Sequence, residues 1–402
     1  MRRLHIVSAF CVISKFYIIY KVFISLGEFM DYFLMHKDDP VARISIEPDG
    51  IKWKENINKK LLPLVLSKVQ DDEMSEKMNL WNGNRCIPAG RPNYQELLDR
   101  LNLKHSSDWI TLSYMCSLTD CYWFKTTDSQ VTWQDVNFHQ NGFDSNLYKF
   151  LFYGDLTTAI NNFYSPDIVT DGAIPKMWAQ DNKAFCLIKK SNESICRTQC
   201  NEKIASKVLD MLEIPHANYE LTQEGNEVHC VSYCFINDDT EEFIPAYDVI
   251  QGLGCKDEGT RDIFVRLGLS SEFDAMLVVD FLLGNVDRHT RNFGVIVDSD
   301  TQEIKRFAPL FDHGDSYMLT DLGNLYYSID GMKFNEMILT ASDDALEISK
   351  KFDIDTFSQI IDSIPYIDEY TKEDMLTELQ RRVEHIGEIL IEREFEIDDR
   401  EY

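Results

Sequence analysis

The sequence predicts an α+β fold of two lobes, a small β-rich lobe followed by a helical lobe, preceded by a small mixed N-terminal domain. Three observations support this order. Residues 146–236 have the pattern of short strands around one helix. An apolar helix and then a β-hairpin follow within residues 270–311, and residues 343–397 carry apolar residues three and four positions apart. We therefore divide the chain into residues 1–29, 30–145, 146–236 and 237–402.

Composition and charge narrow the class of protein. The chain has 402 residues, of which 44% are hydrophobic and 12% aromatic, enough for packed cores in two or three domains. Lys and Arg total 40 against 68 Asp and Glu, for a net charge of −28. Such a charge repels phosphate backbones and anionic lipid headgroups. We therefore expect no direct nucleic-acid binding and no broad attachment to a membrane surface.

Residues 1–29 superficially resemble a signal peptide or membrane anchor. Arg2 and Arg3 precede a long apolar stretch, but Lys15 and Lys21 interrupt it. The charge-free run thus falls short of the roughly 18 to 20 residues that span a bilayer, and no small-residue cleavage site follows. We interpret this stretch as an extension or peripheral segment, expect no stable membrane anchor, and leave open whether the mature protein retains it.

Residues 30–145 form a mixed α/β region whose role the pattern does not reveal. Alternating runs such as "VARISI" predict strands, and its tryptophans are typical of a core or an interface rather than of a cofactor site. The ten cysteines of the chain are scattered. The closest spacings, Cys196 to Cys200 and Cys230 to Cys234, lack the paired knuckles of a zinc site. We expect reduced thiols and a cytoplasmic protein.

Residues 146–236 predict strands, a turn, a lysine-bearing strand and a helix. "PDIV" has the pattern of a strand, the turn after it contains Gly172, and two strands surround a hairpin turn at residues 180–183. The second of these, "AFCLIKK", ends in Lys189 and Lys190. A helix over residues 198–214 has Glu202 near its start and is ended by Pro215, and "EVHCVSYCFIN" predicts two further strand-like stretches.

This order of elements is typical of a lobe that handles phosphate. A glycine-bearing turn can present backbone N–H groups to phosphates, and a lysine on an adjacent strand can neutralise their oxygens. Glu202, on the helix behind that strand, could hold the lysine in place. Each element is also common in proteins without any such role, so this region alone does not decide the function.

The segment "GNVDRHTRNFG", residues 284–294, carries the strongest functional signal. The helix "SEFDAMLVVDFLLGN" ends at Gly284, and a hairpin follows, with strands over residues 293–297 and 304–311 and a turn at 298–301. Asp312 comes directly after the second strand. The hairpin therefore returns a second carboxylate towards the loop that contains Asp287.

The residue types in these two loops suit phosphoryl transfer. Asp287 could orient an attacking hydroxyl and accept its proton. Asn292 and Asp312 could supply oxygen ligands to magnesium. The neighbouring Arg288, His289 and Arg291 could fix the loop or contact the transferred phosphate.

"GNVDRHTRNFGVI" followed by "APLFDHG" resembles the catalytic and metal-binding loops of HipA-like serine/threonine kinases, and more distantly the loop of phosphatidylinositol kinases. The resemblance covers about residues 150–390 and includes "DGAIPKMW" and "NEKIASKVL". It implies a protein-kinase-like fold that uses ATP and Mg2+, with a small β-rich N-lobe over residues 146–236 and a helical C-lobe over 237–402. In the family, histidine follows the catalytic aspartate, as His289 does here.

The resemblance also implies a role for each matching residue. The expected catalytic residues are Asp287 as the base, with Asn292 and Asp312 as the magnesium ligands. Lys189 would contact the α/β phosphates with Glu202 as its ion-pair partner, although Lys190 leaves the choice of lysine open. Gly172 would lie in the phosphate-covering turn, and residues 235–237 would border the adenine. HipA carries a regulatory autophosphorylated serine in this turn; Thr170 is the nearest hydroxyl here, and we assign it no role.

These observations predict an ATP- and Mg-dependent kinase that phosphorylates Ser or Thr of a protein. A small-molecule or lipid kinase of the same fold is one alternative, although the acidic charge disfavours anionic lipid surfaces. A catalytically silent nucleotide-binding regulator, of the toxin–antitoxin type, is another. An antitoxin-like or regulatory partner is consistent with each. The sequence leaves the substrate and the oligomeric state undetermined.

Overall fold

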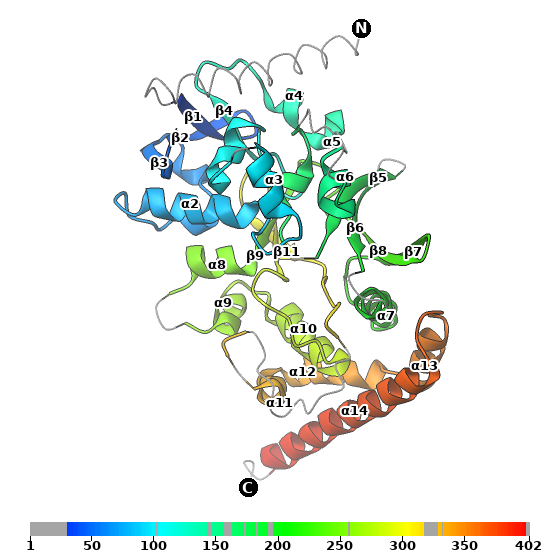
Figure 1. Ribbon diagram of the computed structural model, residues 1–402. Helices are drawn as coiled ribbons and strands as arrows, with labels where there is room; N and C mark the ends of the chain where they lie inside the picture. The colour runs from blue at the N-terminus through cyan, green and yellow to red at the C-terminus, as the bar shows by residue number, and fades with distance from the viewer. Residues whose placement is uncertain are drawn as a thin grey trace. The chain divides into compact units, whose positions relative to one another are not determined.

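The computed structural model describes residues 30–101, 103–143, 146–155, 163–172, 174–181, 184–191, 196–255, 258–316, 329–331 and 333–398. The predicted N-terminal extension, residues 1–29, lies outside them. The chain divides into two compact units (Figure 1). The first contains the chain up to Lys190 together with residues 236–243 and 297–303, and the second contains residues 191–235, 244–296 and 304 onward.

A four-stranded antiparallel sheet forms the centre of the first unit. Its order is β3-β2-β1-β4, and the strands are β1 (Met30–His36), β2 (Asp39–Glu47), β3 (Gly50–Asn56) and β4 (Tyr122–Thr126). The predicted alternation is present in β2, where Arg43 is exposed between buried Ala42 and Ile44. One face of the sheet is therefore available for the apolar core of the region.

Short helices complete the first unit, with α2 alongside β3 (Figure 1) and α6 against β5 (Lys176–Asp181). The helices are α2 (Met74–Arg85), α3 (Tyr94–Leu101), α4 (Trp133–Val136), α5 (Phe138–Asn141) and α6 (Asn146–Tyr153), with the 3-10 helices η1 (Lys59–Leu61), η2 (Leu64–Leu66), η3 (Ser106–Thr111) and η4 (Pro166–Val169). Trp109 and Trp123 are fully buried, which confirms that these aromatic residues belong to the core. The same core continues through Leu147, Phe150 and Ile168.

The β-hairpin that carries the two lysines has the predicted form. Strand β5 (Lys176–Asp181) pairs antiparallel with β6 (Ala184–Lys190), and Lys176 lies opposite Lys189. The prediction of a strand at "PDIV" is wrong, because these residues form η4. Ser165 caps this helix by accepting a hydrogen bond from the Asp167 N–H, and Pro166 occupies its first turn. Ser-Pro-Asp is a helix-start signal, and proline disfavours a strand interior.

The second unit begins with α7 (Arg197–Met211), which buries Ile204, Val208 and Leu209 as the spacing predicted. The helix ends before Pro215 because Glu213 adopts a left-handed conformation, and the Ile214 N–H donates to the Leu209 carbonyl. Strands β7 (Tyr219–Glu224) and β8 (Glu227–Tyr233) then form an antiparallel hairpin. The prediction of two strands within "EVHCVSYCFIN" is wrong, because the segment supplies only β8.

Strands β9 (Glu241–Pro245), β10 (Gly294–Asp298) and β11 (Ile304–Phe307) form a sheet of order β11-β10-β9. The predicted hairpin is confirmed, although β11 ends at Phe307 rather than at residue 311. Beyond it, residues 215–217 and Leu310 exchange backbone hydrogen bonds, so a partner other than β10 holds this part of the chain. Helices α8 (Ala246–Leu253), α9 (Thr260–Arg266) and α10 (Ser270–Leu283) lie between β9 and β10 in sequence.

The C-terminal part is helical, as predicted. It contains α11 (Phe334–Met337), η6 (Ile338–Thr340), α12 (Asp343–Leu346), η7 (Glu347–Lys351), α13 (Ile354–Asp362) and the long α14 (Glu369–Asp398). In α14, Leu379, Ile386 and Leu390 are buried, whereas Leu376 and Val383 are half-buried at the edge of the same face. The helix packs against α10 and α13 (Figure 1), and so supports the helix that leads to the loop of residues 284–294.

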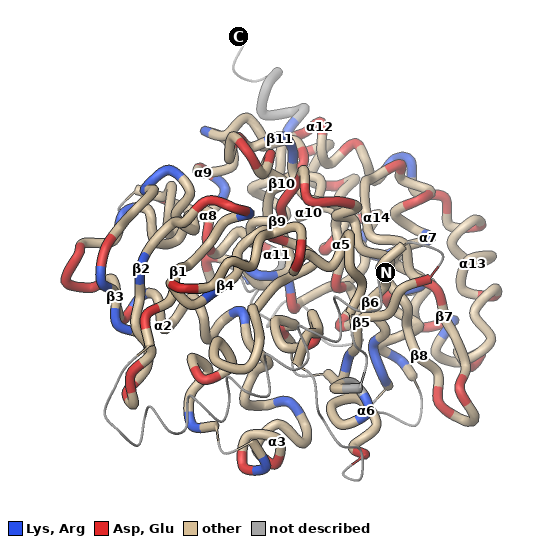
Figure 2. The backbone as a smooth tube through the Cα atoms, turned by 90° about the horizontal axis from the view of Figure 1, so that it is seen from above, with Lys and Arg blue, Asp and Glu red and all other residues tan. Residues whose placement is uncertain are grey.

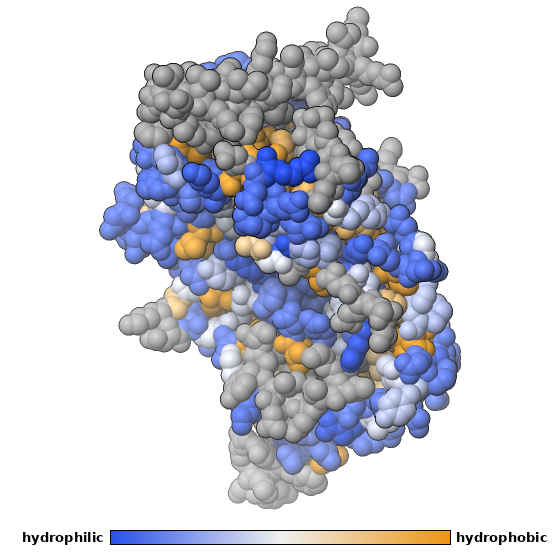
Figure 3. Space-filling view, in the orientation of Figure 1, coloured by the Kyte–Doolittle hydropathy of each residue, from blue (hydrophilic) through white to orange (hydrophobic). Residues whose placement is uncertain are grey.

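The surface is polar and acidic. Asp and Glu positions are spread over many elements rather than gathered on one (Figure 2), and the face in Figure 3 is mostly hydrophilic with small separate apolar patches. Among the described residues, no helix is long and apolar enough to cross a membrane. The nine cysteines that the structure describes are free thiols.

Candidate functional site

The loop of residues 284–294 starts at the end of a buried helix. α10 is apolar over most of its length, and Gly284 ends it with φ of +66°, a left-handed conformation in which glycine is favoured. The Asn285 N–H donates to the Asp280 carbonyl and closes the helix end. A Cβ atom at Gly284 would lie 2.5 Å from Nη1 of Arg382, whose guanidinium donates to the Leu282 carbonyl. Close packing by α14 thus explains the glycine.

Arg288 joins the three segments that make the site. Its guanidinium binds both carboxylate oxygens of Asp280, with Nε at 2.9 Å and Nη2 at 3.0 Å, and both side chains are fully buried. Nη1 donates to the carbonyl of Asn292, at 2.7 Å, and to that of Phe311. Because one side chain binds α10, the loop and the residue before Asp312, Arg288 is a structural clamp. Of the two alternatives that the sequence left for it, loop support is confirmed.

The loop itself is closed by its own hydrogen bonds. The His289 and Asn292 N–H groups donate to the carbonyls of Asp287 and His289, each at 2.8 Å. The Asn292 side chain donates its Nδ2 to the Asp287 carbonyl, at 3.1 Å, so its oxygen is the atom suited to a cation. The Arg291 guanidinium lies over the Tyr247 ring, with 5.1 Å between the guanidinium carbon and the ring centroid, a contact that stabilises the loop.

Asp312 is held in an uncommon backbone conformation, with φ of +61°. Its N–H donates to the hydroxyl of Tyr219, and the next N–H, of His313, donates to the buried carboxylate of Glu202 at 2.8 Å. An L-residue in this region costs about 1–2 kcal/mol. The two side chains from β7 and α7 offset that cost, and fix the direction in which the Asp312 carboxylate leaves the chain.

The segment after Asp312 packs tightly on α7. Asn201 donates to the carbonyls of Gly314 and Ser316, at 2.9 and 2.6 Å. A Cβ atom at Gly314 would lie 2.4 Å from Cγ2 of Thr198, closer than carbon atoms approach in proteins. Only glycine therefore fits here without a shift. This explains the glycine two residues after Asp312.

The charge of Asp312 influences the pKa of Asp287. The pKa of Asp287 is raised, first by partial burial and then by the charges of Asp315 and Asp312, while His289 and Arg288 oppose the rise. The negative charges of Asp315 and Asp312 thus disfavour ionisation of Asp287. Hard oxygen donors with excess negative charge fit a magnesium ion, and the carboxamide oxygen of Asn292 fits the same set.

The other predicted residues divide between the units. Glu202 lies in the second unit, where it contacts His313, whereas Lys189 and Gly172 lie in the first. Lys189 is buried on β6. The next side chain, Lys190, leaves the opposite face of the strand and places its ammonium 5.8 Å from the centroid of the Tyr153 ring. Gly172 has φ of +95°, a conformation that favours glycine.

Sequence reasoning missed several residues that build the site. Asp280 and Asn285 are buried partners, because the Asn285 amide also donates to the Asp280 carboxylate. A single carboxylate within the apolar run "VVDFLL" was the available signal, since a buried Asp needs a cation. Tyr219 and Asn201 had no comparable signal, because their contacts depend on how α7 and β7 pack.

The comparisons with known proteins agree with this geometry. A HipA-like C-terminal domain matches residues 168–366, which contain both loops. This part of the chain is a HipA-like domain. A solved structure of Shewanella oneidensis HipA, in complex with HipB and operator DNA, aligns with a TM-score of 0.57 at 13% identity and covers 89% of this chain and 99% of that one. This likeness confirms the predicted kinase-like α+β fold.

A second solved structure is similar over a shorter length. The Helicobacter pylori proinflammatory kinase CtkA shares 21% identity, with 56% of this chain and 95% of that chain covered, at a TM-score of 0.47. No curated protein matches this chain.

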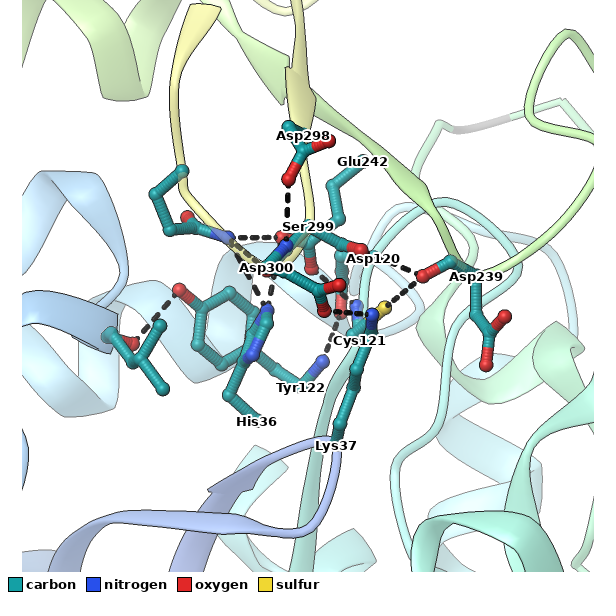
Figure 4. A network of polar contacts seen from close by, with 12 residues as sticks. His36, Lys37, Asp120, Cys121, Tyr122, Asp239, Glu242, Asp298, Ser299 and Asp300 are labelled. Carbon is teal, nitrogen blue, oxygen red and sulfur yellow. Dashed lines mark hydrogen bonds and ion pairs between the residues drawn. The ribbon is translucent and has the colours of Figure 1, made fainter.

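The first unit contains a separate polar network (Figure 4). His36, Cys121 and Glu242 are buried, and their ligand atoms lie within 4.8 Å of one another, close enough to hold a metal ion. Glu242 is nevertheless already bonded, because one oxygen accepts the Cys121 N–H at 2.6 Å and the other contacts His36 Nε2 at 3.0 Å and accepts the Gln302 amide at 2.6 Å. We interpret the trio as a hydrogen-bonded core that joins β1 and β4 to residues 236–243 and 297–303.

Proposed function

We propose that this HipA-like protein transfers the γ-phosphate of ATP to Ser or Thr of a protein substrate in a magnesium-dependent reaction. The observation that supports it most directly is the convergence of Asp287, Asn292 and Asp312, whose two loops are joined by Arg288. A buried clamp of this kind maintains the separation of the loops before any ligand binds. Preorganisation of this type is the main contribution of a protein to phosphoryl transfer.

In this proposal each residue has one task. Asp287 accepts a hydrogen bond from the attacking hydroxyl and takes its proton as the new bond forms. Its raised pKa, caused by burial and by Asp315 and Asp312, makes it a better proton acceptor than an ordinary aspartate. Asn292 and Asp312 would hold magnesium, which when bound neutralises charge on the phosphates. Glu202 keeps Asp312 in position through the neighbouring N–H of His313.

The proposal extends to ATP contacts on the resemblance to the family and on local structure. We assign the phosphate contact to Lys189 rather than Lys190, because the Lys190 ammonium already lies over aromatic rings. Gly172 would lie in the phosphate-covering turn. Phe235 packs on Phe311, with ring centroids 5.7 Å apart, and this apolar pair next to Asp312 suits a purine.

The family also suggests a partner and a compartment. The Shewanella HipA structure contains HipB and operator DNA, and we propose an antitoxin-like or regulatory protein partner for this chain as well. Direct contact with DNA is not part of the proposal, because the net charge of −28 opposes it. Free thiols at all nine described cysteines support a cytoplasmic location.

The proposal is tested by incubating the full chain with γ-labelled ATP and Mg2+ in the presence of protein, lipid and aminoglycoside acceptors. We expect label on Ser or Thr of a protein, the chain itself included, and loss of this label in Asp287→Asn. Asp355→Asn, at an exposed position on α13, is the matched control and should retain transfer. Label on the lipid or aminoglycoside alone would replace the protein-kinase proposal. Magnesium-dependent ATP binding without any transfer would favour a silent regulator.

A further inference from the structure

Arg91 makes an unusual contact between the N-terminal region and the turn that contains Gly172. It lies in the loop between α2 and α3 and is only 2% exposed. Its Nη2 donates to the carbonyls of Thr170, Asp171 and Gly172, at 2.6, 3.1 and 2.9 Å, and its Nε donates to Gly172 at 3.1 Å. One guanidinium therefore binds three consecutive carbonyl oxygens of a single turn.

The burial of Arg91 is energetically costly. No carboxylate lies within ion-pair distance of it in the described part of the chain, and its Nη1 has no hydrogen-bond partner there. Burial lowers the pKa of this guanidinium to about 10, although Asp167 and Asp171 partly oppose the change through their charge. Burying a cation without a paired anion costs free energy, so Arg91 is not expected to stabilise the folded chain through its charge. Its contacts point instead to control of the shape of the turn.

Other contacts from the same region hold the residues before the turn. The Ile87 N–H donates to the Ile168 carbonyl at 3.1 Å, and both side chains are buried in the core of the N-terminal region. The hydroxyl of Thr170 donates to the Pro166 carbonyl and accepts the Trp178 Nε1–H, at 2.8 and 2.9 Å. The turn is thus fixed on one side by β5 and on the other by Arg91.

We propose that Arg91 is a positioning residue for the phosphate-covering turn, and that presenting it is a function of residues 30–145. The inference depends on the proposed function only in giving this turn a task in ATP binding. The carbonyls of residues 170–172 all accept hydrogen bonds from Arg91, and the Gly172 N–H donates to the Asp171 carboxylate at 2.7 Å, so these side chains fix the backbone of the turn. Without the guanidinium, three carbonyls would lose their donor and the turn would lose its fixed conformation.

The contact is tested with Arg91→Ala and Arg91→Lys in the full chain. Lysine keeps the charge but lacks the planar group that binds three carbonyls together. Arg85→Ala is the matched control, because Arg85 is also a largely buried arginine of this region, but it binds Asp120 at 2.6 Å and lies over the Trp81 ring. The measurements are hydrogen exchange in peptides covering residues 166–181, and the KM for ATP and kcat of phosphate transfer.

We expect both Arg91 variants to exchange faster in residues 166–181 and to raise the KM for ATP about tenfold with a smaller change in kcat, since misplacement of a binding group weakens positioning. Arg85→Ala should lower Tm and leave the exchange and the KM near wild type. Unchanged exchange in Arg91→Ala, or an equal rise of KM in Arg85→Ala, would overturn the inference. Absence of transfer by wild type would refute the proposed function, while the exchange result would still test the contact.

Discussion

Replacement of Arg288 by methionine is the most informative perturbation of the site. The side chain is fully buried and binds Asp280 through two hydrogen bonds, so its loss leaves a carboxylate in an apolar helix without a cation. Removing one partner of a buried ion pair costs about 3–5 kcal/mol. At about 2–4 °C per kcal/mol for a unit of this size, Tm should fall by roughly 6–20 °C.

A double variant separates stability from positioning. In Asp280→Leu combined with Arg288→Met, no buried charge remains, and replacing a buried pair by apolar residues is often neutral. The double variant should therefore recover most of the lost Tm. It should not recover phosphate transfer, because the carbonyls of Asn292 and Phe311 still lack the donor that joins the two loops.

Calorimetry and a transfer assay on the same preparations show whether Arg288 positions the two loops or only neutralises Asp280. A matched control is Arg261→Met, because Arg261 binds Asp274 of the same helix but its own side chain is 34% exposed. This variant should lose less Tm than Arg288→Met and retain transfer. If the double variant regains both stability and transfer, Arg288 serves only to neutralise Asp280, and the clamp interpretation is wrong.

Three further predictions concern other parts of the chain. Asp287→Asn should abolish transfer yet raise Tm in the presence of a chelator. The pKa of Asp287 is raised in the folded chain, so ionisation of this carboxyl lowers the stability of the folded state once the pH exceeds the pKa that Asp287 has in the unfolded chain. Calorimetry at neutral pH checks this. Gly314→Ala should weaken magnesium-dependent ATP binding by about 1–3 kcal/mol through its contact with Thr198, and added Thr198→Ser should restore it, as measured by titration calorimetry. His36→Leu should lower Tm by removing a partner of Glu242, and elemental analysis of wild type should find no zinc; one zinc per chain would contradict a purely hydrogen-bonded network.

The sequence predicted those parts of the site that depend on local pattern. The apolar run before Gly284 predicted α10 and its end, because a buried helix followed by a left-handed glycine has a distinct local signature. The alternating residues of the hairpin predicted that Asp312 returns towards Asp287. The raised pKa of Asp287, to which Asp312 contributes, supports this closeness.

The sequence could not predict contacts that depend on the packing of distant elements. The pairing of Glu202 with Lys189 stays a prediction, and nothing in the sequence indicated that the Glu202 carboxylate also accepts the N–H of His313, 111 residues away. Arg91 had no pattern of its own, because its partners are backbone carbonyls of residues 170–172, and a carbonyl acceptor leaves no trace in the sequence. The strand predicted at "PDIV" was wrong because the helix-start signal of Ser165 and Pro166 is stronger than the short apolar pattern that follows it.

The most direct test of the account is mass spectrometry of the full chain after incubation with ATP and Mg2+, in wild type and in Asp287→Asn. The account predicts that wild type gains phosphate on Ser or Thr of itself or of an added protein, and that Asp287→Asn gains none while it still binds ATP. Equal phosphorylation in the two proteins would contradict the central claim that Asp287, Asn292 and Asp312 form a site for phosphate transfer.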